Sequence, residues 1–501
     1  MSCFNPTPIP PEDDMTRRFL VTWLAALMLA GCGGPIISDP VGGPGGGAPP
    51  MGGDPSGDVG ATPGGAQDMG LARRKIAEGI VPAPEDFVAE GLYSEHDLPL
   101  DGPPCEQTLC LRTATGIATA LDTGRQEVFV QVGLSSNVNP ATFRRKPLDA
   151  ALVIDHSGSM HGEPIEAVKE AARRLVAKLD ENDTFSLIIF DDSAQTLVTQ
   201  SPVKDREALL RAIDTIYDAG GTCIECGLRM GFQQLAKAQT DAGRARRLFL
   251  FTDAMPNVGM TGEGEFMTLI RSNSSEGRDT TVFGVNIAFS QSLVTAISAV
   301  RGANSFYLSN PERTRTIFDE DFDYLVTPIA YDLKMALTPA EGFKVEAVYG
   351  LPGVAPGASQ AEMNVSTVFL SRRRGAILAR LSRSSDVAPA QSVMTGDLSF
   401  QATEGGTSRT TLTASYEGSE PLSGTESWYS QRSVRKTVAL TNFILGARSA
   451  CEQWKKGERA AARAQADRTA ALLQAEADRL DDAPLRTEAE LAFKLAALMV
   501  P

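Results

Sequence analysis

A strand–helix alternation runs through the middle of the chain. Near-continuous apolar runs predict buried strands, and apolar residues spaced three and four apart predict helices between them. The strands are expected at residues 151–155, 184–190, 247–253 and 280–287, and the helices at 164–179, 207–216, 224–238 and 292–300. Strands that are apolar on both faces and alternate with helices form mostly parallel sheets covered on both sides. We therefore predict an α/β unit over residues 146–327.

The pattern changes to strand alternation on either side of this unit. Alternating apolar and polar residues with Gly and Pro turns predict an antiparallel, β-sandwich-like segment over residues 328–430. The same alternation at 127–136 predicts a strand within a β-containing segment at 72–145. If that strand joins the later sheet, the α/β unit is an insertion in a β domain. Residues 431–501 return to a helical pattern, which predicts C-terminal helices packed along one face.

The beginning of the chain combines a basic pair with a short apolar stretch. The apolar residues 19–30 are too few to span a bilayer comfortably. They end in Leu-Ala-Gly-Cys, which resembles the lipobox of bacterial lipoproteins and implies that Cys32 receives lipid and becomes the mature N-terminus. Residues 1–32 are therefore predicted to be a leader and signal peptide, with Met1 and Met15 as alternative starts. An ordinary cleaved signal and a single anchor helix are the other interpretations.

A Gly/Pro-rich stretch follows the cysteine. Residues 33–71 cannot bury a core and predict a flexible linker that holds the folded part away from a membrane. Gly33 stands directly after the cysteine, where lipoproteins kept at the inner membrane carry aspartate. The lipobox resemblance therefore implies the outer membrane of a bacterial envelope.

Carboxylates and hydroxyls follow the ends of predicted strands. Asp155, Ser157 and Ser159 follow the first buried strand, Thr222 follows a Gly-Gly turn before a helix, and Asp253 ends another strand. Ligands of open α/β sheets bind at the carboxyl ends of the strands, so we expect these side chains to meet. Hard oxygen ligands of this kind suit Mg²⁺, with Ca²⁺ and Mn²⁺ as alternatives, and do not suit zinc.

The order Asp-x-Ser-x-Ser, Thr, Asp resembles the metal-ion-dependent adhesion site of von Willebrand factor A (VWA) domains. The resemblance covers the α/β unit and implies a Rossmann-like VWA fold. It also implies that the three hydroxyls bind the metal, that the two aspartates act directly or through water, and that an acidic residue of a protein partner completes the shell. The order of lipobox, linker, β segment and VWA unit resembles VWA-containing bacterial surface lipoproteins.

The serine motif has two other interpretations, a structural turn and a nucleophile. Asp and Ser favour turns and helix caps, so the motif alone could be structural. A nucleophilic serine needs a positioned base. His156 is expected to point away from its serine neighbours, His161 has no obvious orienting acid, and Gly-x-Ser-x-Gly is absent. We therefore expect no enzymatic activity from these serines.

The cysteines suggest disulfides in an oxidising compartment. Cys105 and Cys110 could close a small loop, whereas Cys451 is left over. Cys223 and Cys226 follow the predicted metal-binding threonine near a helix N-terminus, where a thiol can be redox-active. A structural disulfide is the favoured alternative for this pair. The spacing of the cysteines and histidines does not fit a zinc site.

These features support a lipid-anchored, non-enzymatic envelope protein that binds a divalent cation and, through it, an acidic partner. The net charge of −15 argues against nucleic acid as that partner. The alternatives are an envelope assembly scaffold in which the metal mainly stabilises the fold, and a thiol-redox protein using Cys223 and Cys226.

Overall fold

The computed structural model describes residues 59–238, 243–253, 263–287, 296–297, 299–351, 361–403 and 405–500. The leader with Cys32 lies outside these ranges, as does most of the helix expected at 292–300. None of the helices in the described ranges has the length and apolar character needed to cross a bilayer.

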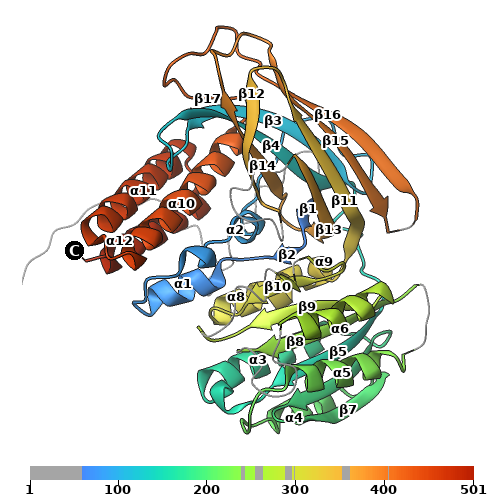
Figure 1. Cartoon of the computed structure of the whole chain (residues 1–501). Coiled ribbons are helices and arrows are strands. Elements are labelled where there is room, and N and C mark those ends of the chain that lie inside the picture. Colours follow the sequence, from blue (N-terminus) through green and yellow to red (C-terminus); the bar gives the residue numbers. More distant parts are fainter. Residues whose placement is uncertain are drawn as a thin grey trace, which may run out of the picture. The chain divides into compact units, whose positions relative to one another are not determined.

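The α/β unit is built on a sheet with the strand order β2-β10-β9-β8-β5-β6-β7 (Figure 1). Neighbouring strands pair in parallel, except that β6 and β7 are antiparallel. The predicted mostly parallel sheet is confirmed. The strands are β2 (Gly65–Ala66), β5 (Leu148–Asp155), β6 (Thr184–Phe190), β7 (Ala194–Pro202), β8 (Ala245–Thr252), β9 (Asp279–Gly284) and β10 (Asn304–Tyr307).

Helices cover both faces of this sheet. Leu152 of β5 belongs to the core that includes Ile165 of α3, whereas its neighbour Val153 belongs to the opposite core with Leu228 of α5. Pro164 lies in the first turn of α3, where its missing N–H costs no helical hydrogen bond. The helical segments are α3 (Glu163–Lys178), α4 (Arg206–Asp214), α5 (Ile224–Leu235), α6 (Glu263–Ser275), α8 (Pro311–Arg315), a π-helical stretch (Thr316–Asp321) and α9 (Phe322–Leu325).

A second, antiparallel sheet has the order β12-β14-β4-β1-β13-β11-β15-β16, with β3 on the free edge of β4 and β17 beyond it. Thr113 Oγ1 of β3 donates to the Thr413 carbonyl oxygen of β16 at 2.8 Å. The edge strand β16 therefore lies beside β3. The sequence predicted a β-sandwich-like segment, and the structure shows its strands as one antiparallel sheet that curls around a core. The strands are β1 (Val59–Pro63), β3 (Cys110–Thr119), β4 (Gln126–Ser136), β11 (Pro328–Pro339), β12 (Phe343–Tyr349), β13 (Glu362–Ser371), β14 (Ala376–Arg383), β15 (Ser392–Ala402), β16 (Thr407–Ser415) and β17 (Trp428–Tyr429).

The α/β unit is inserted in this second sheet. β4 precedes the unit in sequence and β14 follows it, yet Val132 of β4 pairs with Ile377 of β14. The strand predicted at 127–136 therefore does join the later sheet.

The prediction of a flexible linker over residues 33–71 is wrong for residues 59–71. Residues 59–71 are buried and form β1, β2 and the start of α1 (Gly70–Ala77). Gly60 pairs with Ser371 on one side and Ser135 on the other, and a Cβ at Gly60 would overlap the carbonyl oxygen of Arg373. This glycine is needed for close backbone packing, so the Gly-rich composition does not indicate flexibility here.

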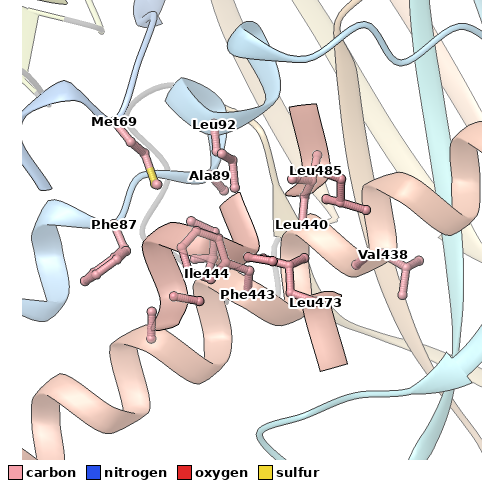
Figure 2. Packing of buried hydrophobic residues seen from close by; sticks show 14 of the residues in the cluster. Met69, Phe87, Ala89, Leu92, Val438, Leu440, Phe443, Ile444, Leu473 and Leu485 are labelled. Carbon is pink, nitrogen blue, oxygen red and sulfur yellow. The ribbon is translucent and has the colours of Figure 1, made fainter. Parts of the chain in front are cut away.

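The predicted C-terminal helices are confirmed as α10 (Arg432–Lys455), α11 (Arg459–Leu480) and α12 (Ala483–Leu498). Figure 2 shows Phe443 and Ile444 of α10 packed with Leu473 of α11 and with residues from the N-terminal segment. Phe87 meets Phe443 edge to face, with ring centroids 6.1 Å apart. Phe87 precedes α2 (Ala89–Glu95), a helix that the sequence pattern did not predict.

A buried ion cluster ties α12 to the N-terminal helices. Glu488 accepts two hydrogen bonds from Arg73, at 2.7 and 2.9 Å, and lies 3.3 Å from His96 Nε2. Burial alone would raise the pKa of Glu488, but Arg73 and His96 outweigh it and lower the pKa from 4.5 to about 2. The ion pair therefore stabilises the fold fully above about pH 4.5 and loses this effect as the pH falls towards 2.

We expect Glu488→Gln to lower the free energy of unfolding by about 3 kcal/mol at pH 7, because it removes the buried carboxylate shared by Arg73 and His96 and leaves Arg73 with Glu95 alone. Urea denaturation at pH 7 and at pH 3 measures the effect, and the gap to the wild type should narrow at the lower pH. Glu490→Gln, at an exposed position of the same helix, should change stability by less than about 0.5 kcal/mol. If the difference in unfolding free energy between Glu488→Gln and the wild type is the same at pH 7 and pH 3, the pKa of Glu488 is not lowered by this ion pair.

Candidate metal site

Asp155 is the last residue of β5 and is fully buried. Its Oδ1 accepts a hydrogen bond from the Ser157 backbone N–H at 3.0 Å, and its Oδ2 accepts one from Thr252 Oγ1 at 2.7 Å. Met160, two residues beyond the Ser157–Gly158 turn, is also fully buried and holds the loop against the core. The carboxylate is therefore fixed at the carboxyl edge of the sheet.

The two serines connect Asp155 to Asp253. Ser157 Oγ lies 3.1 Å from Ser159 Oγ, and Ser159 Oγ donates to Asp253 Oδ1 at 2.9 Å. Asp253 is fully buried and directly follows β8, the strand beside β5. Ser157 is buried and Ser159 is exposed, so this cluster is open to solvent on the Ser159 side.

The Thr222 loop lies against the serine loop. Gly158 N–H donates to the Gly220 carbonyl oxygen at 3.0 Å, and Ala219 N–H donates to the His156 carbonyl oxygen at 2.7 Å. Gly220 has a φ of 70°, in the left-handed region that favours glycine. The structure therefore brings all five predicted residues to one edge of the sheet, with Thr222 buried two residues after this turn.

The two carboxylates of the site lack a basic partner. Burial raises the pKa of Asp155 to about 6, and the nearby Asp253 adds to the shift. Burial also raises the pKa of Asp253. Neither carboxylate forms an ion pair with a lysine or arginine among the described residues. Buried carboxylates with hydroxyl neighbours and no basic residue fit the oxygen shell of a hard divalent cation.

The donor set depends on the hydroxyls. In the described part of the chain, no three His, Cys, Asp or Glu side chains come close enough together to hold a metal by themselves. With only Asp155 and Asp253 as charged donors, a cation here would need Ser157, Ser159 and Thr222 as well.

Two residues at the site were not predicted from the sequence. Thr252 holds Asp155, and Asn286 Nδ2 donates to Asp253 Oδ2 at 3.4 Å. Asn286 has a φ of 64°, which asparagine tolerates better than most residues. Both are polar residues at the carboxyl end of an apolar strand, so the signal that identified Asp253 applied to them too.

The histidines do not contact the serine hydroxyls. His161 Nδ1 lies 3.2 Å from both carboxylate oxygens of Asp218, an acidic neighbour that the sequence did not reveal. His156 Nδ1 lies 2.8 Å from the Tyr217 carbonyl oxygen. Within the described ranges, the hydroxyls of Ser157 and Ser159 bond to each other and to Asp253, and not to a histidine.

The structure joins Cys105 to Cys110 and Cys223 to Cys226 in disulfides. Cys223 is buried and directly follows Thr222, so its disulfide links the loop of the candidate metal site to the first turn of α5. Cys451 is an unpaired, buried cysteine, and burial raises the pKa of its thiol to about 12.

Comparison with known proteins identifies the α/β unit. A family model described as von Willebrand factor type A domain matches residues 150–256. The uncharacterized protein sll0103 of Synechocystis sp. is 35% identical over 179 residues, which cover 36% of this chain and 42% of that protein. Human inter-alpha-trypsin inhibitor heavy chain H3 is 34% identical over 121 residues, which cover 23% of this chain and 14% of that protein. The chain thus spans less than half the length of these curated relatives.

A solved structure extends the similarity beyond the α/β unit. The protein described as von Willebrand factor type A from Catenulispora acidiphila aligns with 79% of this chain and 96% of its own, at a TM-score of 0.51 and 14% identity. At that identity the similarity shows the fold alone. Together with the family match over residues 150–256, it shows that the α/β unit of this chain is a VWA domain.

Proposed function

We propose that the chain is a non-enzymatic, lipid-anchored protein of the bacterial cell envelope. Its VWA domain would bind a divalent cation and, through the cation, an acidic group of a protein partner. The observation that carries this proposal is the set of five oxygen-bearing residues at one sheet edge, in which Asp155 and Asp253 are buried without a basic partner.

The balance of charges supports an external carboxylate as the missing ligand. The hydroxyls of Ser157, Ser159 and Thr222 would add no charge, and an aspartate that acts through water would leave part of the cation's positive charge uncompensated. When bound, the cation would supply a Lewis-acidic position for a carboxylate of the partner. Asp155 is fixed by Thr252 and Asp253 is held by Ser159 and Asn286, so the chain orients its own donors in advance. Mg²⁺ is our first choice of ion, with Ca²⁺ and Mn²⁺ as alternatives.

The fold supports the same class of function. A VWA domain indicates a role in protein–protein interaction or adhesion. Anchoring is inferred from the motif that ends at Cys32, and the residue after it, Gly33, favours the outer membrane. The Gly/Pro-rich residues before Val59 would supply the tether.

An affinity pull-down from envelope extract tests the proposal. We expect Mg²⁺ to support retention of a partner, and chelator or Thr222→Ala to reduce retention at least tenfold. Thr338→Ala changes an exposed threonine of β11 and should leave retention unchanged. Full retention in excess chelator would contradict the proposal. A large loss of thermal stability in chelator, without any cation-dependent partner, would instead favour the assembly scaffold.

A further inference from the structure

A pocket of about 330 Å³ opens beside the candidate metal site. One wall comes from β6 and β7 and the residues between them, including Ile189, Asp191, Gln195 and Leu197. His156 and Tyr217 also line the pocket. Because His156 lies between Asp155 and Ser157 in the chain, the pocket and the metal site share one loop. The volume is at the lower end of the range found for ligand pockets, and it suits a single long side chain.

The pocket holds a carboxylate whose one basic neighbour among the described residues is a histidine. Asp191 Oδ1 accepts hydrogen bonds from the Ser193 backbone N–H at 2.9 Å and from Ser193 Oγ at 3.3 Å. The nearest basic group to Asp191 Oδ2 in the described chain is His156 Nε2, at 3.9 Å. No lysine or arginine of the described ranges pairs with this carboxylate, whose side chain is 26% exposed.

A histidine ring lies beside this carboxylate and is held by the backbone. His156 has a side chain only 10% exposed, and its Nδ1 is bonded to the Tyr217 carbonyl oxygen at 2.8 Å. Since a carbonyl oxygen only accepts, Nδ1 carries a proton and donates it to Tyr217. The Asp191 carboxylate is therefore the group in the pocket that suits a donor with positive charge.

The remaining walls suit the stem of such a donor. Ile189 and Leu197 offer apolar surface to methylene groups. Tyr217 is 73% exposed, so its ring is available to a cation at the pocket mouth. Lysine and arginine side chains combine an apolar stem with a cationic end.

We propose that this pocket receives a lysine or arginine side chain of the partner. We further infer that this basic residue lies close to the acidic residue that completes the cation's shell, and this part of the inference rests on the proposed function. The partner would therefore present a base and an acid side by side, and Asp191 would select for the base. The cation alone would accept any accessible carboxylate, so the pocket supplies the specificity.

The first test needs no metal. We expect n-butylammonium and ethylguanidinium, added to the metal-free full chain, to shift the NMR methyl signals of Ile189 and Leu197 in a saturable way. The isosteric, uncharged n-butanol should not do so. Asp191→Asn keeps the acceptor for Ser193 but removes the charge, and it should abolish the shifts. Asp192→Asn removes a charge from the next, exposed residue, which does not line the pocket, and should preserve them.

The second test joins the two sites. Short glycine-based peptides carry one aspartate and one lysine, placed one to three residues apart in either order, with norleucine replacing lysine or asparagine replacing aspartate as controls. In Mg²⁺ we expect the best lysine peptide to bind at least fivefold more tightly than its norleucine analogue. Asp191→Asn should remove this difference and Asp192→Asn should retain it.

The outcomes separate the two proposals. The pocket assignment is wrong if n-butylammonium and ethylguanidinium also shift the methyl signals of Asp191→Asn. It is equally wrong if they do not shift those of the wild type, whatever the peptides show. If the lysine and norleucine peptides bind equally at every spacing, the proposal that the partner carries a base beside its acidic residue is wrong. If the methyl shifts occur but binding depends neither on the peptide aspartate nor on Mg²⁺, the pocket stands and the cation-mediated function fails.

Discussion

Replacing Asp155 with alanine is expected to abolish stabilisation by Mg²⁺. A ligand at 100 times its Kd stabilises a fold by about 2.7 kcal/mol, and the wild type should gain this amount if the site binds as proposed. The variant should gain less than about 0.5 kcal/mol at the same concentration, because it lacks one of only two charged donors. Calorimetric titration with Mg²⁺ and thermal unfolding with and without the ion measure the two effects.

The variant should remain folded without the cation. Asp155 is held by hydrogen bonds from Ser157 and Thr252, and their loss costs about 1 to 3 kcal/mol. Asp192→Ala removes an exposed carboxylate from the neighbouring strand end and should keep the full Mg²⁺ effect. An unchanged gain in Asp155→Ala would place the cation elsewhere in the chain.

Gly60→Ala is expected to be the most disruptive single-methyl change in the antiparallel sheet. The added Cβ would overlap the backbone carbonyl of Arg373, and Gly60 is paired on both sides, with β13 and with β4. Backbone atoms cannot rotate away as a side chain can, so the strands must separate. We expect a loss of at least about 3 kcal/mol in the free energy of unfolding, measured by urea denaturation.

A glycine in open space provides the control. Gly264 lies in α6, and a Cβ there would meet nothing within 4 Å. Gly264→Ala should be neutral or stabilising, because alanine favours a helix more than glycine does. If Gly60→Ala were equally harmless, β1 would not occupy the place between β4 and β13.

The candidate site could be predicted because its signals lie at strand ends. Asp155 and Asp253 each follow a run of apolar residues that had to be a buried strand, and Thr222 follows a turn that had to contain glycine. The positions of Thr252 and Asn286 carried the same signal, but neither residue type is distinctive by itself. Asp191 was missed because its pocket needs β7, a strand at the sheet edge with no apolar run to mark it.

The beginning of the fold could not be predicted for a different reason. The Gly/Pro-rich composition of residues 33–71 predicted a flexible tether. The place of Gly60 depends instead on its packing against β4, β13 and the turn at Arg373, which the local sequence does not show. Likewise, the two residues of β2 become a strand only by pairing with β10, far away in sequence. Elements whose partners are distant and whose own sequence is weakly patterned are fixed by tertiary contacts.

The insertion of the VWA unit determines which sheet can form first while the chain is synthesised on the ribosome. Val132 of β4 emerges long before its partner Ile377 of β14, and the whole α/β unit is made between them. The central strands β5, β6, β8 and β9 of that unit find their partners within the inserted stretch. We therefore expect the VWA unit to acquire its core co-translationally, while the edge of β4 that pairs with β14 is still open. Closure of the antiparallel sheet would then be the slow, late step, since it joins the segments most distant in sequence.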